Sequence, residues 1–160
     1  MSLKTLFPDP SPKIPKWLVF VILGLGLLGL ADASYLTANH YFGVPVNCII
    51  GEGCDTVLRS AYSEILGVPV ALLGALYYLA ILILAVAYID TEKPVILKLW
   101  ASVTPLGFLF SLWFVAAQLF IIRSICVYCM FSALTSTLLF LTGIFIFYLF
   151  RDTKRSETAV

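Results

Sequence analysis

Four long apolar stretches, separated by short polar ones, set the pattern of this chain. They cover residues 17–42, 67–89, 95–122 and 126–150. A helix of about 20 apolar residues crosses the roughly 30 Å hydrocarbon core of a bilayer, and each stretch reaches that length. The pattern therefore predicts an all-α membrane protein, a four-transmembrane-helix bundle with a short helix in one connecting loop.

Polar segments at both ends frame a single membrane domain. Residues 1–16 carry four prolines and three lysines and are predicted to be a disordered cytoplasmic arm. Residues 17–150 form the predicted four-helix domain, and residues 151–160 form a polar cytoplasmic tail. We see no internal repeat, so the chain is predicted to be one domain.

One charged residue, Asp32, lies inside an apolar stretch. An intramembrane carboxylate is a functional candidate by default, and the structural alternative is a group that faces the bundle interior and bonds to Ser34 or Thr37. The surrounding Ala31-Asp32-Ala33 loosely resembles a signal-peptide cleavage site. Because the apolar run continues beyond it, an uncleaved helix is favoured.

Composition and charge narrow the class of protein to which this chain can belong. Hydrophobic residues make up 61% of the 160 residues and charged residues 12%, which is more apolar surface than a soluble domain of this size can bury. The net charge of +1 indicates no nucleic-acid partner. Eight of the ten lysines and arginines lie in the arm, the loop after the second helix and the tail, whereas Arg59 and Arg123 lie on the other side. The positive-inside rule then predicts a multi-pass cell-membrane protein with cytoplasmic termini and four extracytoplasmic cysteines.

The loop of residues 43–66 carries the first cysteine pair, Cys48 and Cys54, on either side of a glycine-containing turn. A short helix is predicted for residues 55–65, because apolar residues there fall roughly on one face. Such a helix would lie along the membrane surface.

The second pair, Cys126 and Cys129, lies at the start of the last apolar stretch. A spacing of three residues puts both sulfurs on one face of a helix. If Cys126 opens the helix, the unpaired N–H groups and the positive end of the helix dipole favour its thiolate, and Arg123 adds a cation nearby. This arrangement suits the making and breaking of a disulfide at the membrane edge.

Three interpretations of the four cysteines compete. One is a pair of structural disulfides, although a Cys-x-x-Cys bridge closes too short a loop to constrain much chain. Another is a four-thiolate zinc site, although the first pair is spaced more loosely than is usual for zinc and the outer compartment tends to oxidise thiols. The third is a redox relay, in which two dithiol pairs pass electrons by thiol–disulfide exchange toward a lipid-soluble quinone. The placement of both pairs at the membrane edge favours the relay, without a metal.

These features resemble the vitamin K epoxide reductase (VKOR) family, in particular its prokaryotic stand-alone branch. The resemblance runs from about Ala33 to Phe140. It rests on short motifs whose order along the chain is more specific than any one of them. The motifs are Tyr35-Leu36-Thr37, Cys54-Asp55-Thr56-Val57-Leu58-Arg59-Ser60, Gly67-Val68-Pro69-Val70-Ala71 with Gly74, and Cys126-Val127-Tyr128-Cys129.

The resemblance implies a membrane thiol-disulfide oxidoreductase that oxidises a thioredoxin-like partner and supports disulfide bond formation. In this path Cys48 takes electrons from the partner and Cys54 passes them to Cys126. Cys129 then delivers them to a membrane quinone, ubiquinone or menaquinone. The family positions beside or over the quinone are matched here by Ser60, Val57, Leu58 and Tyr62.

Two positions depart from the vertebrate reductases of the family. An asparagine and a tyrosine that touch the quinone oxygens there are replaced by Val70 and Ala133, which favours reduction of a plain quinone over reduction of an epoxide. The chain ends at Val160, so the partner is expected to be a separate thioredoxin-fold (DsbA-like) protein. The alternative function from another class is a small membrane scaffold or transporter subunit with structural disulfides.

Overall fold

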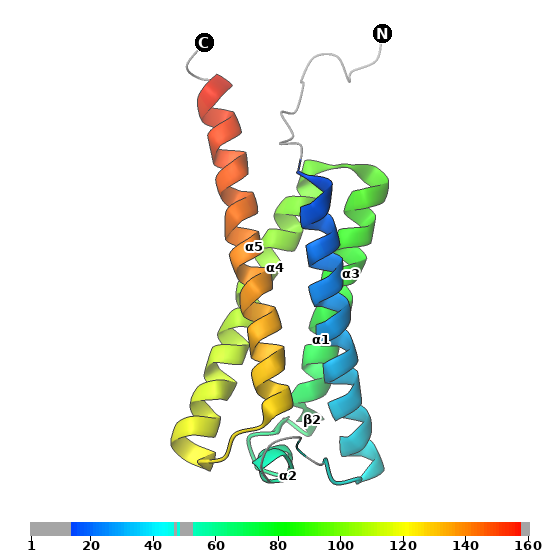
Figure 1. The fold of residues 1–160 in the computed structure, drawn as a ribbon, viewed down its shortest axis with the longest axis vertical. Helices are drawn as coiled ribbons and strands as arrows, with labels where there is room; N and C mark the ends of the chain where they lie inside the picture. The colour runs from blue at the N-terminus through cyan, green and yellow to red at the C-terminus, as the bar shows by residue number, and fades with distance from the viewer. Residues whose placement is uncertain (1–13, 47, 49–52, 158–160) are drawn as a thin grey trace.

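The computed structural model describes residues 14–46, 48 and 53–157, so most of the predicted arm lies outside the described part of the chain. Four long helices run side by side along the molecule (Figure 1): α1 (Lys16–Phe42), α3 (Val70–Thr91), α4 (Pro94–Ala116) and α5 (Val127–Glu157). All four are long and apolar enough to cross a membrane, α4 together with the π-helical segment η2 (Ala117–Ile122). The prediction of an all-α bundle of four transmembrane helices is confirmed.

Each long helix packs against two others, so the four form a ring around a shared core. α1 and α4 each contact both α3 and α5. The core holds large side chains from all of these helices, among them Tyr78, Trp100 and Leu139. The helices approach closely where Tyr77 of α3 lies on Gly107 of α4, because a Cβ atom at that glycine would overlap the tyrosine ring. Small residues commonly permit such approaches in membrane bundles.

The loop between α1 and α3 differs from its prediction. Its helix, α2, covers only Gly53–Leu58, and two short antiparallel strands follow, β1 (Glu64–Ile65) and β2 (Val68–Pro69). Between them, Leu66 and Gly67 have φ angles of 53° and 78°, the left-handed pair that closes a tight hairpin. The prediction of a helix over 55–65 is therefore wrong beyond Leu58, since a chain reversal cannot continue a helix. For the same reason the second transmembrane helix begins at Val70, not at residue 67.

The two ends of the bundle carry different segments (Figure 1). The start of α1, the end of α5 and the α3–α4 turn lie at one end. At the other end lie α2, the hairpin and the connection from η2 to α5. We call this second end the cysteine end, because all four cysteines lie in or next to these segments.

Candidate redox site and adjoining cavity

The loop pair forms a disulfide between Cys48 and Cys54, with 5.6 Å between their Cα atoms. Cys54 is fully buried near the start of α2, whereas Cys48 is only partly buried. The backbone N–H of Cys54 donates to the Cys48 sulfur at 3.1 Å, which fixes the bridge against the first turn of α2. Cys48 is therefore the more accessible residue of this pair. A disulfide also removes both residues, in this state, from the thiolates that a zinc site would need.

α2 lies directly on the connection that carries the second pair. A Cβ atom at Gly53 would overlap the carbonyl oxygen of Ile125, so only glycine permits this backbone approach. Asp55 in the first turn of α2 pairs with Arg59 at 2.9 Å, which places a cation beside this carboxylate. Glu52, the acidic residue directly before Gly53 in the sequence, lies outside the described residues.

The second pair sits at the N-terminus of α5, as the spacing predicted, with both thiols free and buried. Cys126 precedes the helix and acts as its N-cap: its carbonyl accepts the N–H of Met130 at 3.0 Å. Its sulfur lies 3.4 Å from the backbone nitrogen of Cys129, which donates to it. The hydrogen bond from the Cys129 thiol lowers the pKa of Cys126, and backbone N–H groups of Cys129 and Tyr128 add to this effect, which outweighs the opposing cost of burial. The lowered pKa favours the thiolate form of Cys126.

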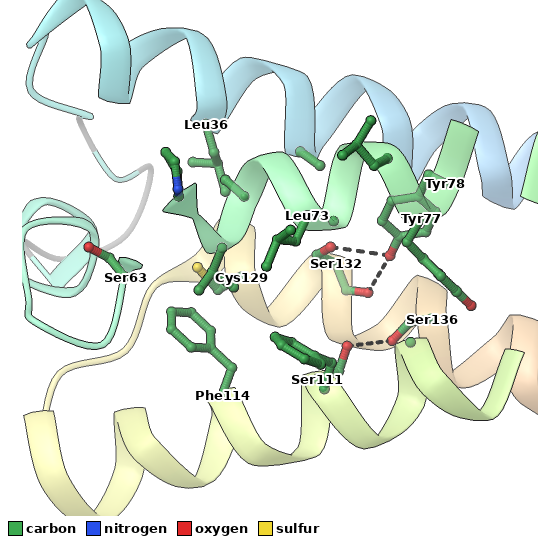
Figure 2. Close-up of a pocket in the computed structure, with 18 of the residues that line it drawn as sticks. Leu36, Ser63, Leu73, Tyr77, Tyr78, Ser111, Phe114, Cys129, Ser132 and Ser136 are labelled. Atoms are coloured by element: carbon green, nitrogen blue, oxygen red, sulfur yellow. Dashed lines mark hydrogen bonds between the residues drawn. The ribbon is translucent and has the colours of Figure 1, made fainter. Parts of the chain in front are cut away.

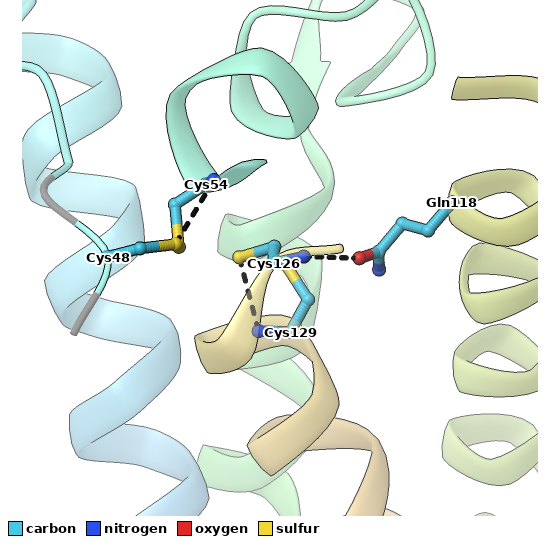
Figure 3. Close-up of a disulfide and its surroundings, with 5 residues drawn as sticks. All are labelled: Cys48, Cys54, Gln118, Cys126 and Cys129. Atoms are coloured by element: carbon cyan, nitrogen blue, oxygen red, sulfur yellow. Dashed lines mark hydrogen bonds between the residues drawn. A yellow bond between two sulfur atoms is a disulfide. The ribbon is translucent and has the colours of Figure 1, made fainter. Parts of the chain in front are cut away.

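All four cysteines belong to one apolar cluster at the cysteine end (Figure 3). Cys54, Cys126 and Cys129 are buried in it, and Cys48 packs against it. Leu36, Val57 and Phe114 complete its centre. The two cysteine pairs thus lie in the same part of the fold, which is a precondition for thiol–disulfide exchange between them.

A cavity of about 470 Å³ opens inside the bundle beside the second pair. It runs from Cys129 and Ser63 at the cysteine end to Tyr77 and Tyr78 deeper in the bundle (Figure 2). Its walls come from α1, α3, α4 and α5 and are mostly apolar, which is typical of a site for a lipid-soluble ring compound. Cys129, 8% exposed, is the cysteine that lines it.

The family model named "Vitamin K epoxide reductase family" matches residues 20–144, which include all four cysteines, all of α3 and α4 and parts of α1 and α5. The chain belongs to the vitamin K epoxide reductase family. Membership implies a membrane thiol oxidoreductase, and the Cys48–Cys54 disulfide agrees with that chemistry. This confirms the family that the sequence motifs indicated.

Several polar groups lie at the deep end of the cavity. The Tyr78 hydroxyl lies 2.7 Å from the Thr135 hydroxyl and 3.1 Å from that of Ser132, and it donates to the Ser132 carbonyl at 2.7 Å. The hydroxyl of Tyr77, in contrast, is buried with no hydrogen-bond partner among the described residues. A buried donor without a partner is rare, and here it lies in the wall of a cavity.

The structure separates the four residues that the VKOR resemblance placed beside the quinone. Leu58 lines the cavity, and Val57 is buried in the cysteine cluster next to it. The Ser60 hydroxyl donates to the Val57 carbonyl at 2.7 Å and does not line the cavity. Tyr62 is exposed and is also not a lining residue. A role in quinone binding stays a prediction for each of them.

Sequence reasoning missed most of the cavity wall. One pattern in the sequence could have indicated the part of the wall that α5 forms. Cys129, Ser132 and Ser136 follow one another at spacings of three and four residues and therefore share a helix face. Of the two family positions that depart here, Val70 lines the cavity. Asp32 has one buried carboxylate oxygen without a hydrogen-bond partner among the residues that the structure describes, and the Thr37 hydroxyl bonds instead to the Ala33 carbonyl.

Proposed function

We propose that this protein oxidises a separate thioredoxin-fold (DsbA-like) protein and passes the electrons through both cysteine pairs to ubiquinone or menaquinone. The observation that supports this most strongly is the position of Cys129. It belongs to a dithiol that adjoins the loop disulfide, and it also lines an apolar cavity inside the bundle. One cysteine thus adjoins both the loop disulfide and an apolar cavity of the kind that suits a lipid-soluble quinone.

The first transfer is between the partner and the loop pair. A thiolate of the partner attacks Cys48, the loop S–S bond breaks, and the second partner thiol then displaces Cys48 as the partner closes its own disulfide. Cys54 is released as a thiolate, and the loop pair has gained two electrons. The partial exposure of Cys48 supports its role as the point of attack.

The second transfer is between the two pairs. The Cys54 thiolate attacks Cys126 of an oxidised Cys126–Cys129 pair, a Cys54–Cys126 bond forms, and Cys129 leaves with the electron pair. Cys48 then displaces Cys126 and restores the loop disulfide. The pairing seen here, an oxidised loop and two free helix thiols, corresponds to the state after this step.

The last transfer returns the helix pair to its disulfide. Cys126 and Cys129 give up two electrons as their S–S bond forms, and the quinone takes these with two protons and leaves as quinol. The cavity's volume and apolar walls fit such a ring, and the unpartnered Tyr77 hydroxyl offers a donor to a carbonyl oxygen. Val70 and Ala133 offer no hydrogen bonds, so a plain quinone is favoured over an epoxide.

The orientation follows from the charge distribution. Eight of the ten lysines and arginines lie in segments at the end opposite the cysteines or in the polar ends of the chain. By the positive-inside rule this end is cytoplasmic, and the cysteine end faces an outer compartment where disulfides form.

The test is quinone reduction by the purified protein with a reduced thioredoxin-fold substrate, followed by the loss of quinone absorbance. The unaltered protein should turn over, Cys129→Ala should not, and Ser102→Ala should match the unaltered protein, because that hydroxyl bonds only within its own helix on an exposed face. Turnover by Cys129→Ala would refute the proposed path. If the number of titratable thiols does not change when quinone is added, the result would instead support structural disulfides in a scaffold.

A further inference from the structure

Gln118 is a fully buried polar residue in η2, the π-helical segment that precedes the second cysteine pair. Its side-chain oxygen Oε1 accepts the backbone N–H of Cys126 at 2.9 Å (Figure 3). Its backbone oxygen accepts the N–H of Ser124 at 3.3 Å. One residue therefore holds both the middle and the end of the short connection that leads into α5.

These contacts complete the N-terminal cap of α5. In a common capping arrangement, the N-cap side chain accepts the N–H of the third helical residue, and a Glu or Gln at that third position accepts the N–H of the N-cap. Here Cys126 is the N-cap and Cys129 is the third residue, so the sulfur of Cys126 makes the first bond. Cys129 cannot make the second, because its side chain is the other redox thiol. Gln118 supplies that acceptor from a different helix.

The π-helical backbone of η2 directs the Gln118 side chain toward Cys126. A π-helical turn inserts an extra residue and changes the direction in which side chains point. In η2 it leaves Gln118 buried toward Cys126 while Phe120 and Ile121 are exposed. Arg123, with a φ angle of 56°, then ends the segment and turns the chain toward α5.

We propose that Gln118 is a positioning residue for the redox pair: its amide oxygen fixes the Cys126 backbone, so that the sulfur faces the N-terminus of α5 and the loop disulfide. This rests on the proposed redox role of the pair. Gln118 does not line the cavity, so it acts on the thiol and not on the quinone.

If Gln118 had only a structural role, replacing it would change the stability of the fold and leave the reactivity of Cys126 unaltered. The side-chain nitrogen Nε2 of Gln118 is buried with no partner in the part of the chain that the structure describes. Burying such a donor destabilises a fold, so an apolar residue of the same length removes one source of instability at this position. The bond to Cys126 is what such a replacement would remove, and it would leave the Cys126 N–H buried and unpaired.

The test compares Gln118→Met and Gln118→Asn with Thr104→Val in the full-length reduced protein. Methionine keeps the length without the amide, and asparagine keeps the amide but falls short of the N–H. Thr104→Val removes a buried hydroxyl bond on the same helix, away from the cavity and the cysteines. Alkylation of each cysteine is followed by mass spectrometry across pH, a readout that needs neither quinone nor partner. Thermal unfolding is measured in parallel.

Both Gln118 variants should raise the pKa of Cys126, which slows its alkylation near neutral pH on the order of tenfold, equivalent to one pKa unit. In quinone turnover they should lower kcat while KM for the quinone stays unchanged. Thr104→Val should shift neither quantity. A Cys126 profile that coincides with that of the unaltered protein in both variants would overturn the proposal, even if stability or turnover falls. Loss of quinone turnover in the unaltered protein would instead count against the proposed function alone.

Discussion

The contact between Gly53 and Ile125 gives a direct test of how the two cysteine pairs are held together. Gly53→Ala places a methyl group onto the Ile125 carbonyl oxygen, and both groups are backbone or attached to it, so neither can turn away. α2 must then move outward, on the order of 1 Å, and Cys54 moves with it. A displacement of this size between reacting groups can lower a rate about a hundredfold. The overpacking itself should destabilise the fold by about 1–3 kcal/mol.

The assay isolates the step between the pairs. In a background with Cys48→Ala and Cys129→Ala, mild oxidation should form a Cys54–Cys126 bridge, and its rate is followed by non-reducing peptide mass spectrometry. Gly53→Ala should slow this bridge strongly. Gly24→Ala is the matched control, since a Cβ atom there meets nothing within 4 Å. A bridge that forms equally fast in both alanine variants would show that α2 does not need this approach, and the reasoning would be wrong.

Four further outcomes follow from the site. Tyr78→Phe should destabilise the protein by about 1–3 kcal/mol in chemical denaturation, because the hydroxyl bonds it loses are buried; an unchanged midpoint would contradict that. Tyr77→Phe removes an unpaired hydroxyl, so stability should hold while KM for the quinone rises, and an unaltered KM would exclude a contact with the ring. In Cys54→Ala, the free Cys48 thiolate should attack the disulfide of the oxidised partner and release one partner thiolate, so that a Cys48–partner mixed disulfide accumulates on non-reducing gels; a failure to trap it would reverse the order of the loop cysteines. Because the pKa of Cys126 is lowered, its alkylation should stay fast as pH falls below the range of an ordinary thiol; a normal thiol profile would show that the helix N-terminus does not stabilise the thiolate.

The predictions that proved correct depend on patterns among residues that are close together in the sequence. Helix length and apolar content depend on residues close in the sequence, so the four helices and their approximate limits could be inferred from it. The Cys126–Cys129 spacing likewise placed both thiols on one face at a helix start, because that geometry belongs to a single turn. The family could be inferred from ordered motifs, each of which is also local.

The tertiary structure decided how these pieces meet. The sequence shows two cysteine pairs about seventy residues apart, but only packing of α2 on the turn at Ile125 brings them into one cluster. The cavity is a space between four helices, so its lining residues, Tyr77 among them, depend on helix rotation that a period of 3.6 residues does not specify. Gln118 illustrates the same limit: the sequence shows a polar residue near a helix end, and its bond to the start of another helix exists only because η2 turns it toward Cys126. A sequence determines which residues form a helix, whereas contacts between helices arise from the packing of all of them at once.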